Sequence, residues 1–139
     1  MMRGIVNQNR EATIRLVVGN ANIQRQMIDA VIDTGFTGFL ALPLTIITSL
    51  NLHLYSREEG TLGDGSVCIF DVCPGFVIWD GEFKRIDISA AETIPLMGMS
   101  LLYGYRMQLD AIANGKVTIQ SLRSLSYNDR ELSMNKSCK

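Results

Sequence analysis

The chain has 139 residues, of which 47% are hydrophobic and 19% are charged, and its formal net charge is −1. This length predicts one domain with a single core, and the scattered basic residues give no electrostatic footprint for nucleic acid or for an anionic membrane surface. No apolar run approaches the ~18 residues that a membrane-spanning helix needs, and the first residues lack the apolar segment of a signal peptide. We therefore expect neither a nucleic-acid partner nor a membrane partner.

The first third of the chain predicts two strands and a helix. Residues 12–18 are rich in β-branched side chains and end at Gly19-Asn20, a dipeptide typical of hairpins. Residues 22–32 resume a strand that begins polar and becomes apolar. Residues 43–50 are the best helix candidate, because proline suits the first helical turn and Leu44, Ile47 and Leu50, with Ile46, share one face.

The rest of the chain alternates short strands with turns. Three turn sequences each separate two β-rich segments: Gly63-Asp64-Gly65 lies between residues 57–62 and 66–73, Trp79-Asp80-Gly81-Glu82 between 76–79 and 83–89, and Asn114-Gly115 between 107–112 and 116–119. This spacing predicts an all-β domain with one or two short helices. Residues 121–139 are polar, and we expect them to form a flexible tail.

The most informative motif lies where the second strand must end. Ala30, Val31 and Ile32 suit the middle of a covered strand, and Asp33-Thr34-Gly35 then brings turn residues. A carboxylate at the end of an apolar strand is costly unless it is paired, hydrogen-bonded or reactive. The residues alone leave two interpretations open, because Asp33 suits catalysis but also suits a turn in which its side chain caps its own backbone.

The cysteines and the single histidine argue against a metal site. Cys68 and Cys73 lie five residues apart, so on one strand they face opposite sides and do not pair, and Cys138 lies in the tail. An odd count of cysteines with no secretion signal favours reduced thiols and a cytoplasmic setting. His53 is the only histidine, and no Cys-x-x-Cys spacing is present, so we expect no zinc site.

Four elements in order, namely a strand, Asp-Thr-Gly, a hairpin and an apolar-apolar-Gly segment, carry a resemblance to a known family. Asp33-Thr34-Gly35 after an apolar strand, a glycine-tipped hairpin at residues 62–66, and Leu96-Met97-Gly98 near the end of the domain together resemble the retropepsin-like aspartic proteases. The sequence Asp-Thr-Gly-Phe-Thr-Gly at residues 33–38 most resembles the corresponding motif of the small single-domain aspartic proteases of bacteria. The resemblance covers roughly residues 10–120, so we expect a protease domain over residues 1–120, followed by the tail.

The resemblance implies a closed β-barrel fold and a two-fold dimer. Aspartic proteolysis needs two carboxylates that share a proton, and this chain has a single Asp-Thr-Gly, so the implied enzyme is a homodimer with Asp33 from each subunit. Thr34 would hydrogen-bond across to the partner loop, and Gly35 would leave room for the substrate backbone. Leu62, Gly63, Asp64 and Gly65 would form the flap over a bound peptide or protein. No cofactor and no metal are implied.

The sequence also leaves alternatives. The same fold would serve as a non-catalytic dimeric module that binds peptides or regulates, or as an enzyme that stays inactive until it dimerises or loses its tail. Phe36-Thr37-Gly38 departs from retroviral enzymes, which have a small and then an acidic residue there. Phe36 and Phe39 suit either a substrate pocket or the core, Trp79 suits packing on a sheet face, and His53 suits the surface.

Overall fold

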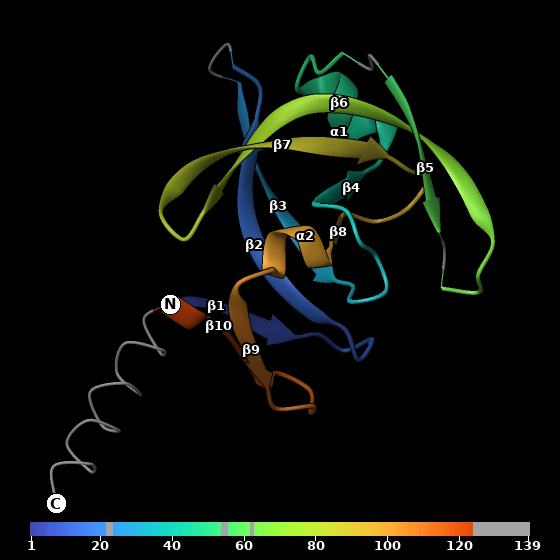
Figure 1. The fold of residues 1–139 in the computed structure, drawn as a ribbon. Helices are drawn as coiled ribbons and strands as arrows, with labels where there is room; N and C mark the ends of the chain where they lie inside the picture. Colours follow the sequence, from blue (N-terminus) through green and yellow to red (C-terminus); the bar gives the residue numbers. More distant parts are fainter. Residues whose placement is uncertain (22–23, 54–55, 62, 124–139) are drawn as a thin grey trace, which may run out of the picture.

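The computed structural model describes residues 1–21, 24–53, 56–61 and 63–123. Within them the chain forms ten strands and two short helices (Figure 1). The strands are β1 (Met2–Val6), β2 (Ala12–Gly19), β3 (Arg25–Ile32), β4 (Leu40–Leu42), β5 (Ser56–Thr61), β6 (Val67–Trp79), β7 (Glu82–Ala90), β8 (Leu96–Met97), β9 (Tyr105–Leu109) and β10 (Lys116–Ser121). The helices are α1 (Leu44–Ser49) and α2 (Met99–Leu102).

Six of the strands close into a barrel. Their order is β6-β7-β4-β8-β3-β2, and the circle closes because β6 also pairs with β2, with Gly19 opposite Phe76. Strand β5 extends the sheet beyond β6, while β1, β10 and β9 extend it beyond β2. Figure 1 shows β6 arching over the barrel, with the β5–β6 hairpin and the β6–β7 hairpin at its two ends.

The core follows from the period-2 alternation of the strands. On β2, Ile14, Leu16 and Val18 are buried, whereas Arg15 between them is exposed and forms a surface ion pair with Asp29 of β3 at 2.9 Å. The buried side chains of the other barrel strands meet these three residues in one cluster. Among the described residues no polar or charged side chain is buried, so the interior is apolar throughout.

The turn sequences form the expected hairpins. Asp80 and Gly81 both have positive φ, 52° and 80°, which is the backbone that a two-residue hairpin loop needs, and β6 and β7 pair on either side of them. Strands β9 and β10 also pair as a hairpin, but their connection spans residues 110–115 and only Asn114 in it has a positive φ, 62°; β9 ends at Leu109, three residues earlier than expected. The β5–β6 hairpin forms at Gly65, whose φ is 85°. The three predicted hairpins are therefore confirmed.

The predicted helix forms at residues 44–49, with Pro43 at its N-cap position. Ile47 and Leu50 are buried, each 2% exposed. Leu44 was expected on the same face but is 45% exposed, because it opens the helix and only the later turn packs on the core cluster. That part of the prediction is wrong.

Strand β6 is longer than the sequence suggests. Residues 66–73 and 76–79 read as separate segments, since Pro74-Gly75 is a turn-like dipeptide, but the strand is continuous from Val67 to Trp79. The pairing explains this. Strand β5 pairs with β6 as far as Val72, and β2 pairs with it from Phe76 onward. Pro74 therefore lies where that side of β6 has no partner strand, so its missing N–H breaks no ladder bond.

The ends of the chain differ from expectation in two respects. Strand β1 was not predicted, yet it pairs with both β2 and β10. Strand β10 runs to Ser121, so the proposed tail at residues 121–139 begins inside a strand, and residues 124–139 lie outside the described part of the chain. Within the described residues, neither helix has the length and apolar character of a membrane span.

Candidate active site

Strand β3 of the barrel leads directly into Asp33. Asp33 directly follows the last residue of β3, and its backbone N–H donates a hydrogen bond to the carbonyl oxygen of Met97 at 2.9 Å. Two residues earlier, the N–H of Val31 donates to the carbonyl oxygen of Pro95, also at 2.9 Å. Strand β8 thus lies parallel to β3 and continues the ladder up to the aspartate. A segment distant in sequence therefore fixes where Asp33 lies.

The loop between β3 and β4 is anchored on the start of α2. The N–H groups of Met99 and Ser100 donate to the carbonyl oxygens of Phe36 and Gly38, at 2.8 and 3.1 Å. Gly98, the N-cap of α2, allows this close approach, because a Cβ atom there would lie 2.2 Å from the carbonyl oxygen of Gly38. Leu96-Met97-Gly98, the last of the elements that carried the resemblance in the sequence, thus supports the aspartate loop directly.

The Asp33 carboxyl group is half-buried and held at one oxygen. Its Oδ1 accepts a hydrogen bond from the N–H of Gly35 at 2.9 Å, as in a turn capped by its own side chain. The described residues offer Oδ2 no hydrogen-bond partner, so one oxygen is left for other chemistry. Thr34 is exposed, and no hydrogen bond links its side chain to the described part of this single chain.

Asp33 lies on the wall of a cavity of about 390 Å³. Some of its lining residues come from the aspartate loop, and others come from β5 and the turn that follows it. The remaining lining residues come from β4, β7, β8 and the segment after β7. The lining residues are Asp33, Gly35, Phe36, Thr37, Gly38, Ala41, Glu59, Thr61, Gly63, Ser89, Ala91, Thr93 and Leu96.

The four candidate flap residues have different places. Gly63 lines the cavity together with Asp33. Asp64 caps the turn, because its Oδ1 accepts hydrogen bonds from the N–H and the hydroxyl of Ser66 at 2.9 and 2.6 Å. The hydroxyl bond, followed by the backbone bond, lowers the pKa of Asp64. Gly65 supplies the positive φ of the turn, and Leu62 lies outside the described residues.

The aromatic residues divide between the two interpretations. Phe36 lines the cavity at Asp33, whereas Phe39 packs partly buried against the core. Trp79 is 3% exposed and meets the ring of Tyr105 edge-on, with ring centroids 5.4 Å apart. His53 is exposed and is not among the residues that line the cavity.

Glu59 is an ionisable residue of this cavity that was not predicted from the sequence. It lies on β5, is exposed and lines the cavity together with residues of the aspartate loop. No hydrogen bond joins Glu59 to Asp33 among the bonds of the described residues. The signal was available in the alternation of the hairpin, because Glu59, Thr61 and Gly63 are spaced two apart.

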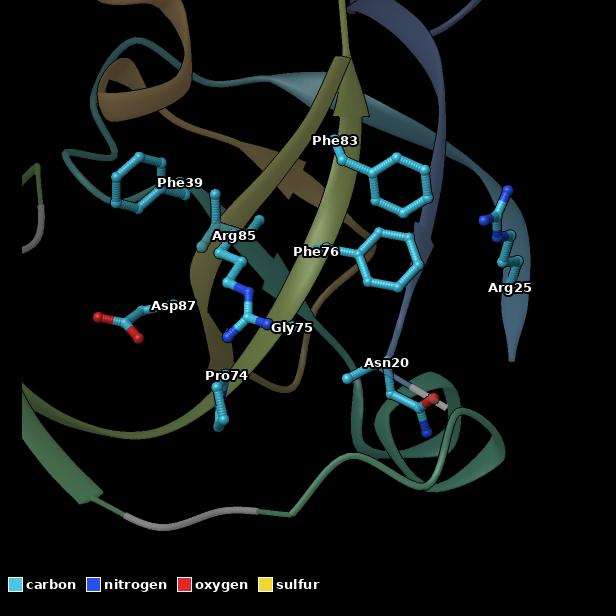
Figure 2. A pocket seen from close by; sticks show the side chains of 11 residues that line it. Asn20, Arg25, Phe39, Pro74, Gly75, Phe76, Phe83, Arg85 and Asp87 are labelled. Carbon is cyan, nitrogen blue, oxygen red and sulfur yellow. The ribbon is translucent and has the colours of Figure 1, made fainter. Parts of the chain in front are cut away.

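A second cavity, of about 700 Å³, is larger but does not contain Asp33 (Figure 2). Three of its lining residues, Arg25, Phe76 and Arg85, lie side by side across neighbouring strands. Gly19 of β2 pairs with Arg25 of β3 on one side and with Phe76 of β6 on the other, and Phe76 pairs with Arg85 of β7. The Arg25 guanidinium lies 4.8 Å from the ring centroid of Phe83 and 5.7 Å from that of Phe76. Because the motif residues line the smaller cavity, we take the smaller one as the candidate site.

The described residues contain no group of three or more His, Cys, Asp or Glu side chains that would hold a metal ion. The sequence matches no protein-family model, and no curated protein matches it. The fold, in contrast, is similar to solved structures.

One similar structure is the crystal structure of a retropepsin-like aspartic protease from Rickettsia conorii, with a TM-score of 0.56 and 20% identity over 86% of this chain and 91% of that chain. Another is the EIAV protease complexed with the inhibitor HBY-793, with a TM-score of 0.47 and 14% identity over 69% of this chain and 88% of that chain. The first likeness confirms the predicted fold, an all-β, retropepsin-like barrel with two short helices.

Proposed function

We propose that this chain is an aspartic endopeptidase that works as a homodimer, with Asp33 of each subunit activating the water that hydrolyses a peptide bond. One observation carries the proposal: Asp33, with Oδ2 unengaged by the described residues, lines a cavity that strand β5 and Gly63 also line. The Asp33 carboxyl group and the β5–β6 hairpin thus belong to the same cavity. The fold likeness to a protein named as a retropepsin-like aspartic protease supports the proposal.

The chemistry requires two carboxyl groups that share one proton. Like charges at such a distance cannot both ionise, so the pair holds one carboxylate and one carboxylic acid. The carboxylate takes a proton from water as the water oxygen attacks the peptide carbonyl carbon, and the acid donates its proton to the carbonyl oxygen. As the tetrahedral intermediate collapses, the carboxyl group that gave up its proton takes one from a hydroxyl of the intermediate, the C–N bond breaks, and the other carboxyl group donates the proton it took from water to the leaving nitrogen.

The second carboxyl group must come from a second copy of the chain. Asp-Thr-Gly occurs once, and Glu59, the other carboxylate that lines the cavity, has no hydrogen bond to Asp33. In an isologous dimer the same loop approaches its own copy across the two-fold axis. The exposed Thr34 hydroxyl would then bond to the partner loop, and Gly35 would leave room for the substrate backbone.

The β5–β6 hairpin would act as the flap. An extended peptide would bind between it and the aspartate loops, with main-chain hydrogen bonds of the kind that strands form. In this proposal Leu62, Gly63, Asp64 and Gly65 close over the peptide and limit the access of water. A non-catalytic dimeric module that binds peptides would use the same cavity, but it would not need the Asp33 carboxyl group.

The test compares wild-type protein with Asp33→Asn on a diverse peptide library. We expect cleavage by the wild type, followed by mass spectrometry, and none by the variant at equal concentration. Cleavage at equal rates by both proteins, or by neither, would refute the protease proposal. Sedimentation of the wild type at the assay concentration separately tests whether two copies of the chain are needed. Cleavage by a strict monomer would contradict an active site that two Asp33 residues share.

A further inference from the structure

Glu59 lines the same cavity as Asp33 but comes from a different element, strand β5. On β5 it lies two residues before Thr61, and both residues line the cavity. They pair with Ile69 and Val67 of β6, so the register of the hairpin sets which side chains face inward. Residues two apart on a strand share a face, and the placement of Glu59 is therefore built into the strand.

The Glu59 carboxylate is not neutralised within the described residues. No ion pair or hydrogen bond engages it there, and the lining residues include no lysine, arginine or histidine. The only other ionisable lining residue is Asp33. A cleft lined by one sign of charge concentrates its field inside the cleft and attracts the opposite charge.

The rest of the wall suits a long apolar chain. Phe36, Ala41, Ala91 and Leu96 supply apolar surface, and the polar groups next to them are the neutral hydroxyls of threonine and serine. Lysine and arginine side chains combine an aliphatic stem with a cationic end. Such a side chain would lay its stem on the apolar wall and bring its charge to Glu59.

We propose that Glu59 is a specificity-determining residue that selects peptide substrates with a lysine or arginine close to the scissile bond. This inference rests on the proposed protease function. In a homodimer each copy contributes one Glu59, so selection would act at two positions related by the two-fold axis. The carboxylate recognises the substrate charge and takes no part in the proton transfers.

The experiment uses matched peptides that differ only in one charge. A cleaved peptide with lysine near the scissile bond is compared with its norleucine analogue, which keeps the aliphatic chain and lacks the ammonium group. We expect wild-type kcat/KM to favour lysine by about 10-fold or more. Glu59→Gln should bring the ratio close to one, Glu59→Asp should retain a preference, and Glu59→Lys should favour a glutamate analogue.

Glu92→Gln is the matched control. Glu92 is also exposed and lies between the lining residues Ala91 and Thr93, but it does not line the cavity itself. It should leave the ratio of lysine to norleucine unchanged. If Glu92→Gln lowers the ratio as much as Glu59→Gln does, the selection comes from general charge, and the assignment to Glu59 is wrong.

A binding arm separates this inference from the proposed function. In an Asp33→Asn background no turnover is expected, and fluorescence anisotropy of the same two labelled peptides should still show tighter binding of the lysine peptide. Adding Glu59→Gln should abolish that preference. Wild-type cleavage with equal rates for both peptides would overturn the Glu59 inference and leave the protease proposal standing. Absence of any cleavage would overturn the protease proposal, and the binding arm would still decide whether Glu59 selects cations.

Discussion

The backbone N–H of Asp33 donates to the carbonyl oxygen of Met97 at 2.9 Å. The position of the aspartate thus depends on its main chain, while Oδ1 of its side chain contributes one further bond to the N–H of Gly35. Replacing the side chain should therefore leave the loop in place. This separates the structural role of Asp33 from its proposed chemical role.

Two substitutions at Asp33 should differ in stability and agree in activity. Asparagine keeps an oxygen that accepts from the Gly35 N–H, so Asp33→Asn should unfold at nearly the wild-type temperature. Asp33→Ala loses that hydrogen bond and should be less stable by about 1 kcal/mol. Both variants should lack peptide cleavage. Urea unfolding and the peptide assay check the two expectations, and activity that follows stability would favour turn capping as the only role of Asp33.

Gly98→Ala should destabilise the protein by about 1–3 kcal/mol. The new Cβ atom would lie 2.2 Å from the carbonyl oxygen of Gly38 and 2.7 Å from that of Phe36, so backbone must move. Gly63→Ala is the control for stability, since nothing lies within 4 Å of its Cβ position. Thermal unfolding of the two variants measures the difference, and equal unfolding temperatures would contradict the close packing of α2 on the loop.

Thr34→Val should weaken the proposed dimer, whereas Thr34→Ser should not. Valine keeps the shape of threonine and removes the hydroxyl, while serine keeps the hydroxyl. Each dimer would lose two symmetry-related hydrogen bonds, which corresponds to an increase in the dissociation constant of roughly 10-fold or more. Sedimentation equilibrium measures this constant. Equal constants for the valine and serine variants would rule out the hydroxyl as the bridging group.

The Cys73 thiol should make stability fall at alkaline pH. Burial, with a smaller contribution from Asp87, raises the pKa of Cys73 from 9.0 to about 11. The folded state therefore holds the proton that the unfolded state releases between these values. The contribution of the protonated Cys73 thiol to the free energy of unfolding is complete below pH 9 and is lost as the pH rises to about 11.

Urea unfolding from pH 8 to 11 measures this effect. The difference in unfolding free energy between wild type and Cys73→Ala, which lacks the thiol, should shrink across that range. In the folded protein, peptide mapping should also show little alkylation at Cys73, because the side chain is 0% exposed. A difference that stays constant with pH would contradict the raised pKa.

Local signals predicted the hairpins and the aspartate well. Asp80 and Gly81 both have positive φ in their turn, and Asn114 has a positive φ in the connection between β9 and β10, a preference that depends only on the residue and its neighbours. Asp33 stood out because a carboxylate seldom ends an apolar strand. These features need no knowledge of the rest of the chain.

Long-range pairing explains what the sequence did not reveal. Strand β8 has only two residues, Leu96 and Met97, and it lies between β3 and β4 through a parallel and an antiparallel pairing that no local pattern encodes. The residue types of β1, Met-Arg-Gly-Ile-Val, do not alternate between polar and apolar although their burial does, because Ile5 is 46% exposed. Glu59 was not predicted as a site residue, because its relevance depends on lining a cavity together with Asp33, which is distant from it in sequence.

The insertion of β8 between β3 and β4 also has a consequence for the newborn polypeptide. On the ribosome, β3 and the Asp-Thr-Gly loop emerge first, but the carbonyl groups that hold them belong to residues 95–97. A nascent or truncated chain that stops before these residues has its aspartate and its β5–β6 hairpin, and it lacks the strand that lies between β3 and β4. Translation order therefore withholds a finished aspartate loop until most of the barrel has been made.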